Sequence, residues 1–292
     1  MSQLGGKCLR AGAIICLLTL TPTVWVGTVS ADVLDRINQD KTIRIAYRED
    51  APPFSYKDKR GEPAGFMVDL CRAVAKKLSE QLRLPSLKVA YVPVSATNRF
   101  DPIEKHDADV LCEPTTATLS RRRRVDFSIP TFVDGASLLT TDMGLSDLAG
   151  LAGHKIGVLA GTTTEEALRG LLKTRGIAAE VVPAKTHNDG FAMLEGGEIS
   201  AYFGDRSILL FLLKDISKEP EKLRIAEDYL TVEPYALALP RGDEDFRLAV
   251  DTALSHIFRS NEIIKIFDQN FAGKLKRSDL IEALYVISGL PD

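Results

Sequence analysis

The strongest constraint on the fold is an alternation of short apolar runs, typical of β-strands, with stretches of helical periodicity. The expected strands are rich in β-branched and apolar residues and span residues 42–47, 87–94, 108–112, 154–161, 179–184 and 201–205. The expected helices span residues 66–82, 162–176, 187–197 and 207–214, and the tail from Asp243 onward is mostly helical. Such alternation predicts an α/β protein with largely parallel sheets.

The alternation occurs twice, which predicts two lobes rather than one. No low-complexity segment, repeat or long linker separates them. The expected hinges are the irregular stretches 131–136 and 230–235, so the chain should leave the first lobe and return to it. We therefore predict that lobe 1 comprises residues 32–132 and 236–292, that lobe 2 comprises residues 133–235, and that a cleft lies between them.

The first 31 residues have the features of a secretory signal peptide. Lys7 and Arg10 form a basic start, residues 11–20 form an apolar run, and the small residues of "VSA" at 29–31 are typical of a cleavage site. The run is shorter than the ~20 apolar residues that a membrane-spanning helix needs. We expect residues 1–31 to be removed and the mature protein to lie in the periplasm.

The charge balance argues against a partner that is a polyanion. Without Lys7 and Arg10, 35 of the 37 basic residues remain against 40 acidic residues. A mildly acidic chain is not suited to neutralising nucleic acid. Cys71 and Cys112 are the cysteines that follow the expected signal peptide. In an exported protein they could form a disulfide or remain two buried thiols, and spacing alone does not decide between these.

Four consecutive arginines stand in the segment "EPTTATLSRRRRVDFSIP" at residues 113–130. If Thr118 caps a short helix, Arg121 to Arg124 fan around its axis at about 100° per residue and cannot all face one partner. The apolar neighbours Val125 and Phe127 are typical of a core. These observations disfavour a nucleic-acid surface and leave room for one arginine with a specific task.

Seven segments, in chain order, are "APPFSY", "GEPAGFMVDLCRAVAKKL", "EPTTATLSRRRRVDFSIP", "GVLAGTTTEEAL", "AYFGD", "EPYALALPRGD" and "EIIKIFDQNFAG". Together they resemble the successive signatures of the extracellular solute-binding proteins of family 3. The fragments "TNRF" and "PAKTHNDGF" resemble the branch that binds glutamate and aspartate.

The resemblance covers residues 32 to about 273 and implies both fold and function. The expected fold is the type II periplasmic binding protein, with two open, mostly parallel sheets, helices on both faces of each sheet and a ligand cleft between lobes. The expected function is that of a monomeric receptor for a polar, acidic amino acid, which delivers it to the permease of an ABC transporter in the inner membrane. Relatives of this fold include the ligand-binding cores of ionotropic glutamate receptors.

The resemblance assigns the α-carboxylate of the ligand to Arg121, which lies four residues before "VDFS". A planar guanidinium offers two parallel N–H groups that match a carboxylate, and such charge-assisted pairs are strong. Thr163 is implied beside it, in a "GTTTEE" segment that follows a strand and opens a helix. Helix N-termini favour anions, although Thr162 or Thr164 could simply cap the helix.

The ligand ammonium is assigned by the resemblance to Asp205, at the end of the expected strand "AYFGD". Carboxyl ends of strands are where open α/β sheets present ligand groups. Thr116 and the backbone at Pro114 would contribute from the first lobe. The alternative is that Asp205 is the N-cap of the helix that follows.

Arg48, Arg99 and His187 match positions that face a side-chain carboxylate in the acidic-ligand branch. Two guanidiniums and an imidazole are costly to bury around a neutral ligand. Each has an alternative: the arginines could be solvated, and His187 could cap a helix. Glu113, where relatives often have a small residue, and Ala96, where acidic binders tend to have a hydroxyl, could shift specificity towards glutamine, asparagine or another polar amino acid.

An enzyme is the principal alternative, because the same fold hosts periplasmic dehydratases acting on prephenate-like acids. Glu113, Asp205 or His187 could act as acid or base. However, the chain has no GxSxG, HExxH, CxxC or phosphate-loop spacing, and its four histidines lack metal-ligand spacing. We expect no catalytic residues, no metal and no cofactor. A soluble sensor that docks on a receptor kinase would share the same site.

The C-terminal segment "LKRSDLIEALYVISGLPD" extends past the usual end of the family. We expect a helix at residues 279–287 that packs Leu280, Leu284 and Ile287 on the first lobe.

Overall fold

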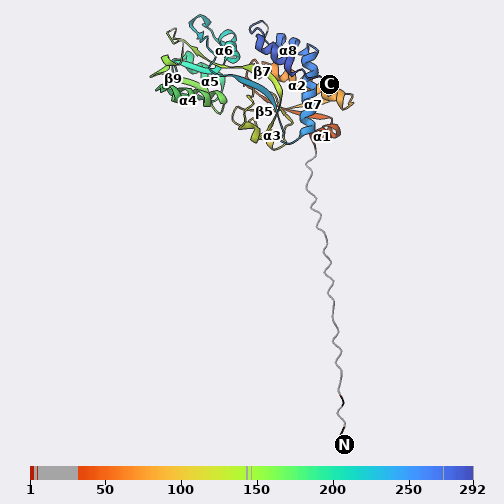
Figure 1. Cartoon of the computed structure of the whole chain (residues 1–292). Helices are drawn as coiled ribbons and strands as arrows, with labels where there is room; N and C mark the ends of the chain where they lie inside the picture. The colour runs from red at the N-terminus through yellow and green to blue at the C-terminus, as the bar shows by residue number, and fades with distance from the viewer. Residues whose placement is uncertain (3–4, 6–31, 143, 146, 272, 292) are drawn as a thin grey trace. The chain divides into compact units, whose positions relative to one another are not determined.

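The computed structural model describes residues 1–2, 5, 32–142, 144–145, 147–271 and 273–291 (Figure 1). The expected signal peptide, residues 1–31, therefore lies almost entirely outside the described residues. From residue 32 onward the chain forms one compact unit that contains two five-stranded sheets. None of the helices in the described part of the chain is both long and apolar enough to span a bilayer.

The first sheet has the strand order β5-β1-β6-β13-β7. Its strands are β1 (Thr42–Arg48), β5 (Lys88–Val94), β6 (Val110–Leu111), β7 (Asp126–Asp134) and β13 (Glu233–Leu239). β1 pairs in parallel with β5 and β6, whereas β13 runs antiparallel to β6 and β7. One strand of five is thus reversed, and the expected mostly parallel sheet is confirmed.

The second sheet has the order β10-β9-β11-β8-β12 and again one reversed strand, β8. Its strands are β8 (Ala136–Thr140), β9 (Lys155–Leu159), β10 (Glu180–Ala184), β11 (Ala201–Asp205) and β12 (Arg224–Ile225). A small third sheet contains β2 (Asp50–Ala51), β3 (Ser55–Lys57) and β4 (Pro63–Ala64). The two large sheets have the same plan, as the repeated pattern in the sequence predicts.

Helices cover both sheets. The helices that pack with the first sheet or with one another beside it are α1 (Val33–Asp40), α2 (Phe66–Gln81), α3 (Asp101–Glu104), α7 (Glu244–Arg259), α8 (Glu262–Phe271) and α9 (Asp279–Ser288). Those on the second sheet are α4 (Thr163–Arg175), α5 (His187–Glu195) and α6 (Arg206–Phe211) (Figure 1). Short 3₁₀ or π turns are found at Arg121–Arg123, Ala149–Leu151, Leu212–Ile216 and Pro220–Lys222.

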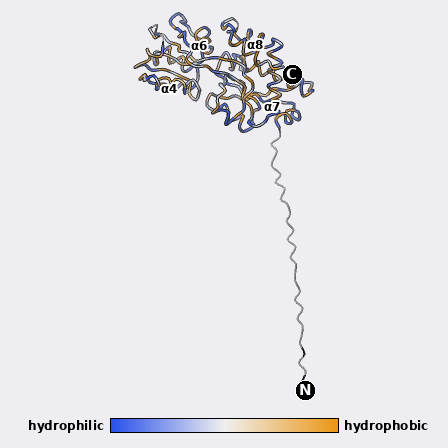
Figure 2. The backbone as a smooth tube through the Cα atoms, in the orientation of Figure 1, coloured by the Kyte–Doolittle hydropathy of each residue, from blue (hydrophilic) through white to orange (hydrophobic). Residues whose placement is uncertain are grey.

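Both faces of each large sheet are buried. On β1, Ile45 belongs to the core cluster that includes α2 and α7, whereas its neighbour Ala46 belongs to a separate cluster with Ile103 of α3. In the second sheet, Phe203 packs with α4 and the adjacent Tyr202 packs with α5. Burial on both faces is typical of mostly parallel sheets. Hydrophobic and hydrophilic stretches alternate along the chain (Figure 2).

The crossings between the sheets are more regular than the sequence predicted. Residues 131–134 continue β7, and β8 begins at Ala136, so Gly135 alone separates the two strands. The return crossing leads directly into β13. A Cβ on Gly135 would lie 2.3 Å from the carbonyl oxygen of Thr231, so glycine lets the two crossing segments approach closely. The expectation of irregular hinges is therefore wrong for most of residues 131–136, while the exact lobe boundaries stay a prediction.

The C-terminal helix forms as expected but buries a different face. α9 packs on β7 and α7 with Ile281, Leu284 and Tyr285 buried. Leu280 and Ile287 are exposed, with relative exposures of 59% and 73%. The prediction was right for Leu284 and wrong for Leu280 and Ile287, because α9 packs on β7 and α7 with the face that carries Ile281 and Tyr285.

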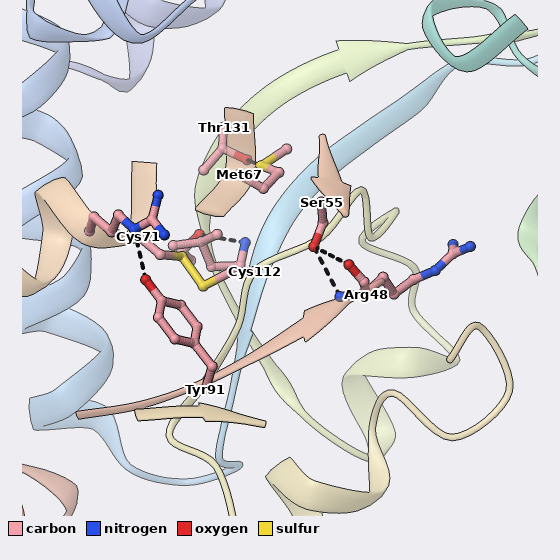
Figure 3. Close-up of a disulfide and its surroundings, with 10 residues drawn as sticks. Arg48, Ser55, Met67, Cys71, Tyr91, Cys112 and Thr131 are labelled. Atoms are coloured by element: carbon pink, nitrogen blue, oxygen red, sulfur yellow. Dashed lines mark hydrogen bonds between the residues drawn. A yellow bond between two sulfur atoms is a disulfide. The ribbon is translucent and has the colours of Figure 1, made fainter. Parts of the chain in front are cut away.

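A disulfide joins Cys71 of α2 to Cys112, which directly follows β6 (Figure 3). This decides between the two alternatives that the sequence left open. The bond closes a segment with a sequence separation of 41 residues. Because Cys112 precedes Glu113 and Pro114, the disulfide ties the start of the cavity wall described below to the core of the first sheet.

Candidate functional site

One cavity lies between the two sheets, and the space in it that the centre of a water-sized sphere can occupy is about 20 Å³. Its lining comes from segments of both sheets. It includes all nine residues that the sequence singled out for ligand binding: Arg48, Arg99, Pro114, Thr116, Arg121, Thr162, Thr163, His187 and Asp205. The lining also contains Glu113, Leu159, Thr164, Phe203 and Gly204. The structure thus brings together residues that are up to 157 positions apart, although their contact with a ligand remains a proposal.

Arg121 is the one member of the arginine run that lines the cavity. Its backbone N–H is 3.1 Å from the Thr118 hydroxyl, and its Nη1 donates to the Thr116 carbonyl at 2.8 Å. Burial lowers the pKa of Arg121, and the charge of Glu113 opposes this. The other three arginines are exposed, and Arg124 pairs with Glu104 at 2.6 Å. One guanidinium is therefore held half-buried towards the cavity, with donors that remain available to an anion.

The N-terminus of α4 forms a second part of the wall. Thr162 is the N-cap: its hydroxyl accepts from the backbone N–H of Glu165 at 3.1 Å. The next two threonines have other partners. The Thr163 hydroxyl oxygen lies 3.3 Å from that of Thr116, and the Thr164 hydroxyl donates to Asp205 at 3.0 Å. Capping by Thr162 therefore leaves Thr163 and Thr164 facing the cavity, at a helix end that favours anions.

Asp205 ends β11 and is the residue before α6, yet its carboxylate does not cap that helix. Asp134 does so instead, because its Oδ2 accepts from the backbone N–H of Ser207 at 3.2 Å. Asp205 accepts from Thr164 and, at 2.7 Å, from the hydroxyl of Tyr235. Burial raises the pKa of Asp205 to about 6, with a further contribution from the charge of Glu233. A buried carboxylate of this kind gains from a cation in the cavity.

Glu233, at the start of β13, is a residue of the site that the sequence analysis missed. It is buried, and its Oε2 accepts from the hydroxyls of Thr116 at 2.6 Å and Thr163 at 3.1 Å. It therefore links a threonine of the first lobe to one of the second. In the sequence, Glu233 could have been recognised as unusual because it is a charged residue at the start of the otherwise apolar segment "EPYALAL".

Arg48, Arg99 and Glu113 form a cluster in the cavity lining, and all three are at most 4% exposed. Glu113 Oε2 is 3.7 Å from Arg48 Nη1, and Glu113 Oε1 is 3.4 Å from Arg99 Nε. Arg48 also lies 2.8 Å from Asp50, and Ser55 fixes its backbone through two hydrogen bonds (Figure 3). Burial lowers the pKa of Arg99 to about 10, and the charge of Glu113 opposes this. We call these three residues the arginine–glutamate cluster.

His187 is buried in the wall and is not a surface cap. The N-cap of α5 is Thr186, in a capping box with Asp189. His187 Nδ1 is 3.0 Å from the hydroxyl of Tyr202. Burial, and secondarily the charge of Arg48, lowers the pKa of His187 well below its usual value. The ring is therefore neutral at physiological pH and offers hydrogen bonding rather than charge.

Other features separate this site from competing kinds of site. Phe54 is fully buried in an aromatic core with Phe66 and Phe132, so it does not wall the cavity. Within the described ranges, no group of three or more His, Cys, Asp or Glu side chains could hold a metal ion. What the cavity offers is a guanidinium and a helix N-terminus for an anion, and a buried carboxylate for a cation.

Comparison with known proteins identifies the family to which these features correspond. Residues 43–273 match the sequence profile of the bacterial extracellular solute-binding proteins, family 3. A protein of Pseudomonas aeruginosa named L-glutamate/L-aspartate-binding protein is 30% identical over 90% of this chain and 87% of its own length. The glutamate/aspartate import solute-binding protein of Escherichia coli is 29% identical over 86% of this chain and 83% of its own length.

Solved structures agree on the fold. An ancestral amino-acid-binding protein described as a precursor of cyclohexadienyl dehydratase superposes with a TM-score of 0.72 at 25% identity, covering 82% of this chain and 99% of that one. A histidine-bound substrate-binding protein of an ABC uptake transporter from Streptococcus pneumoniae gives a TM-score of 0.75 at 20% identity, covering 85% and 100%. The second likeness shows the fold alone.

Proposed function

The chain belongs to the bacterial extracellular solute-binding proteins of family 3, and from this premise we propose that it is the periplasmic substrate-binding component of an amino-acid ABC transporter. Proteins of this family are periplasmic and bind amino acids, and the named relatives are binding proteins rather than enzymes. The ligand is a polar α-amino acid held in the cavity between the two sheets. The partner is the permease of the transporter.

The observation that carries this proposal is the placement of Arg121 and Asp205 in one small cavity. Arg121, supported by Thr163 and the α4 N-terminus, receives the α-carboxylate. Asp205, with Thr116 and the backbone at Pro114, receives the α-ammonium. Because each charged end is bound by residues from both lobes, the ligand favours the state in which the lobes are closed. A permease can then distinguish loaded from empty protein by this closure.

Glutamate or aspartate is the ligand that we propose first. Relatives about 30% identical are named for these two amino acids. Arg48, Arg99 and the neutral His187 present hydrogen-bond donors to the remaining space. A second candidate, glutamine or asparagine, is favoured by one observation: Glu113 already pairs with both arginines.

A calorimetric screen of the twenty amino acids against the chain without residues 1–31 tests the proposal. We expect one polar amino acid, glutamate or aspartate first, to bind with one site per chain. At about 100 times its dissociation constant, the ligand should stabilise the fold by about 2.7 kcal/mol. No response to any amino acid would overturn the proposed function.

The enzyme alternative needs a separate control, because a structural relative is described as a dehydratase precursor. Asp205 and Glu113 are carboxyl groups that a dehydratase could use as acid or base. Incubation with prephenate or arogenate should yield no aromatic product. Turnover of either compound at catalytic enzyme concentration would replace the binding proposal with the dehydratase.

A further inference from the structure

The arginine–glutamate cluster carries an inference about ligand selectivity that rests on the proposed function. Without Glu113, Arg48 and Arg99 would form a strongly cationic wall suited to a second carboxylate. With Glu113, each guanidinium already faces a carboxylate, and Arg48 faces another on Asp50. Arg121 and Asp205 are already assigned to the charged ends of the amino acid. The remaining wall therefore has little net charge to offer a ligand side chain.

One oxygen of Glu113 has no hydrogen-bond partner among the described residues, and this affects which ligand side chain the cavity favours. Glu113 Oε1 and Arg99 Nε are buried and make no hydrogen bond to any described residue, because the 3.4 Å between them is poorly directed. Glu113 Oε1 is thus a buried acceptor without a hydrogen-bond donor, on a residue that lines the cavity. Leaving such a group unpaired is costly, so a ligand that supplies a donor gains affinity there.

The side chains of possible ligands differ in whether they supply that donor. A carboxylate has acceptors only, so it can pair with the arginines but is repelled by Glu113. A carboxamide has an N–H₂ group that can donate to Glu113 Oε1 and a carbonyl that can accept from an arginine. Glutamate and glutamine have nearly the same size, which makes them a matched pair for this difference.

We propose that Glu113 is a specificity-determining residue, which disfavours a ligand carboxylate relative to the carboxamide of the same length. Glu113 acts as an internal counter-ion: it neutralises positive charge on Arg48 and Arg99 that would otherwise be available to an acidic ligand. The pocket is consequently less selective for glutamate over glutamine than its two arginines would make it. Removing the charge of Glu113 should restore that selectivity.

Calorimetric affinities of glutamate and glutamine for wild type and for Glu113→Gln test the proposal. In wild type, we expect glutamine to bind no more than about tenfold more weakly than glutamate. In Glu113→Gln, the ratio of the two affinities should move towards glutamate by at least about tenfold, because a repulsive charge has been removed from a buried site. The variant replaces a charged carboxylate, which can only accept hydrogen bonds, with a neutral carboxamide of the same shape, which can also donate them.

Asp50→Asn is the matched control. It removes the same charge from a residue that also pairs with Arg48, but Asp50 is not in the cavity lining. We expect its glutamate-to-glutamine ratio to stay within about threefold of wild type, because Asp50 lies outside the lining and its side chain is 20% exposed, so that solvent screens its charge from the ligand. Equal shifts in the two variants would overturn a specific role for Glu113.

A purely structural role predicts a different result. If Glu113 only holds the arginines in place, Glu113→Gln weakens both ligands alike and leaves the ratio unchanged, which overturns the proposal. Glu113→Gly, with its fold checked by thermal melting, provides a second variant. If neither variant folds, wild type decides: a preference for glutamate above about tenfold contradicts the inference. Absence of binding by every amino acid would instead refute the proposed function.

Discussion

Asp205 and His187 show how burial assigns different tasks to two titratable side chains of one cavity. Burial raises the pKa of Asp205 to about 6 and, with the charge of Arg48, lowers the pKa of His187 well below its usual value. The carboxylate is therefore the group that titrates near physiological pH, while the imidazole stays neutral. Because the pKa of Asp205 is raised on folding, its protonated form stabilises the fold at low pH. That contribution is lost as the pH rises through about 4 to 6.

Ligand binding should have the opposite pH dependence to this stability contribution. Only ionised Asp205 pairs with an ammonium, so the affinity for an amino acid should fall below about pH 6, by at most tenfold per pH unit. Calorimetric titrations from pH 5 to 8 measure this directly. Asp205→Asn should bind weakly with a nearly flat profile, whereas a flat profile in wild type would contradict the role given to Asp205.

Among the elements, the C-terminal helix α9 contributes to the fold without contributing to the cavity. Ser278 caps it, Tyr285 packs against Phe258 with ring centroids 5.2 Å apart, and the Ser255 hydroxyl donates to the Ser288 carbonyl at 3.0 Å. None of these residues lines the cavity. The helix is therefore a brace for β7 and α7, and its removal should lower stability while leaving the ligand contacts in place.

Two neighbouring residues of α9 separate packing from exposure. Ile281 is 4% exposed, whereas Leu280 is 59% exposed. Ile281→Ala should lower the free energy of unfolding by about 2–5 kcal/mol, because it leaves a cavity in the core. Leu280→Ala should change it by no more than about 0.5 kcal/mol. Urea unfolding measures both values, and similar losses in the two variants would mean that the packing face is wrongly assigned.

Helix α9 also shows the limit of what sequence patterns can predict. Leu280, Leu284 and Ile287 have helical spacing, but so do Ile281, Leu284 and Tyr285, and spacing alone cannot choose between two overlapping apolar faces. The strands β7, β8 and β13 were also missed, and prolines at 130 and 234 interrupt the β-type pattern of β7 and β13. By contrast, α4 and α5 begin and end within about two residues of the prediction, since threonine caps and a C-terminal glycine mark their ends.

In the candidate site too, residues that belong to local sequence motifs could be predicted, whereas roles that depend on long-range contacts could not. All nine expected residues lie in one lining because each was part of a local motif. Glu233 was missed because its role depends on Thr116 and Thr163, which are 117 and 70 residues away and come near it only in the folded chain. The pairing of Glu113 with both arginines likewise depends on long-range packing. Sequence can indicate such a residue as unusual, but it does not show which charge the residue balances.

In the molecule as a whole, several contacts around the cavity join segments of the two sheets. Arg99 faces the Gly161 carbonyl at 3.4 Å from both terminal guanidinium nitrogens, and Glu233 joins threonines of both lobes. Gly161 has a φ of 73°, and a Cβ there would come within 3.2 Å of Thr97. These contacts surround the cavity, so a ligand held from both sides adds its own interactions to the closed arrangement.

We propose that one arginine of the four, Arg121, binds the ligand's α-carboxylate inside this cavity. Calorimetric titration of the preferred amino acid into Arg121→Ala and Arg123→Ala tests it most directly. We predict that Arg121→Ala weakens binding by at least about 100-fold, since a buried charge pair loses one partner, whereas exposed Arg123→Ala binds like wild type. Equal losses in the two variants, or undiminished binding by Arg121→Ala, would contradict the account.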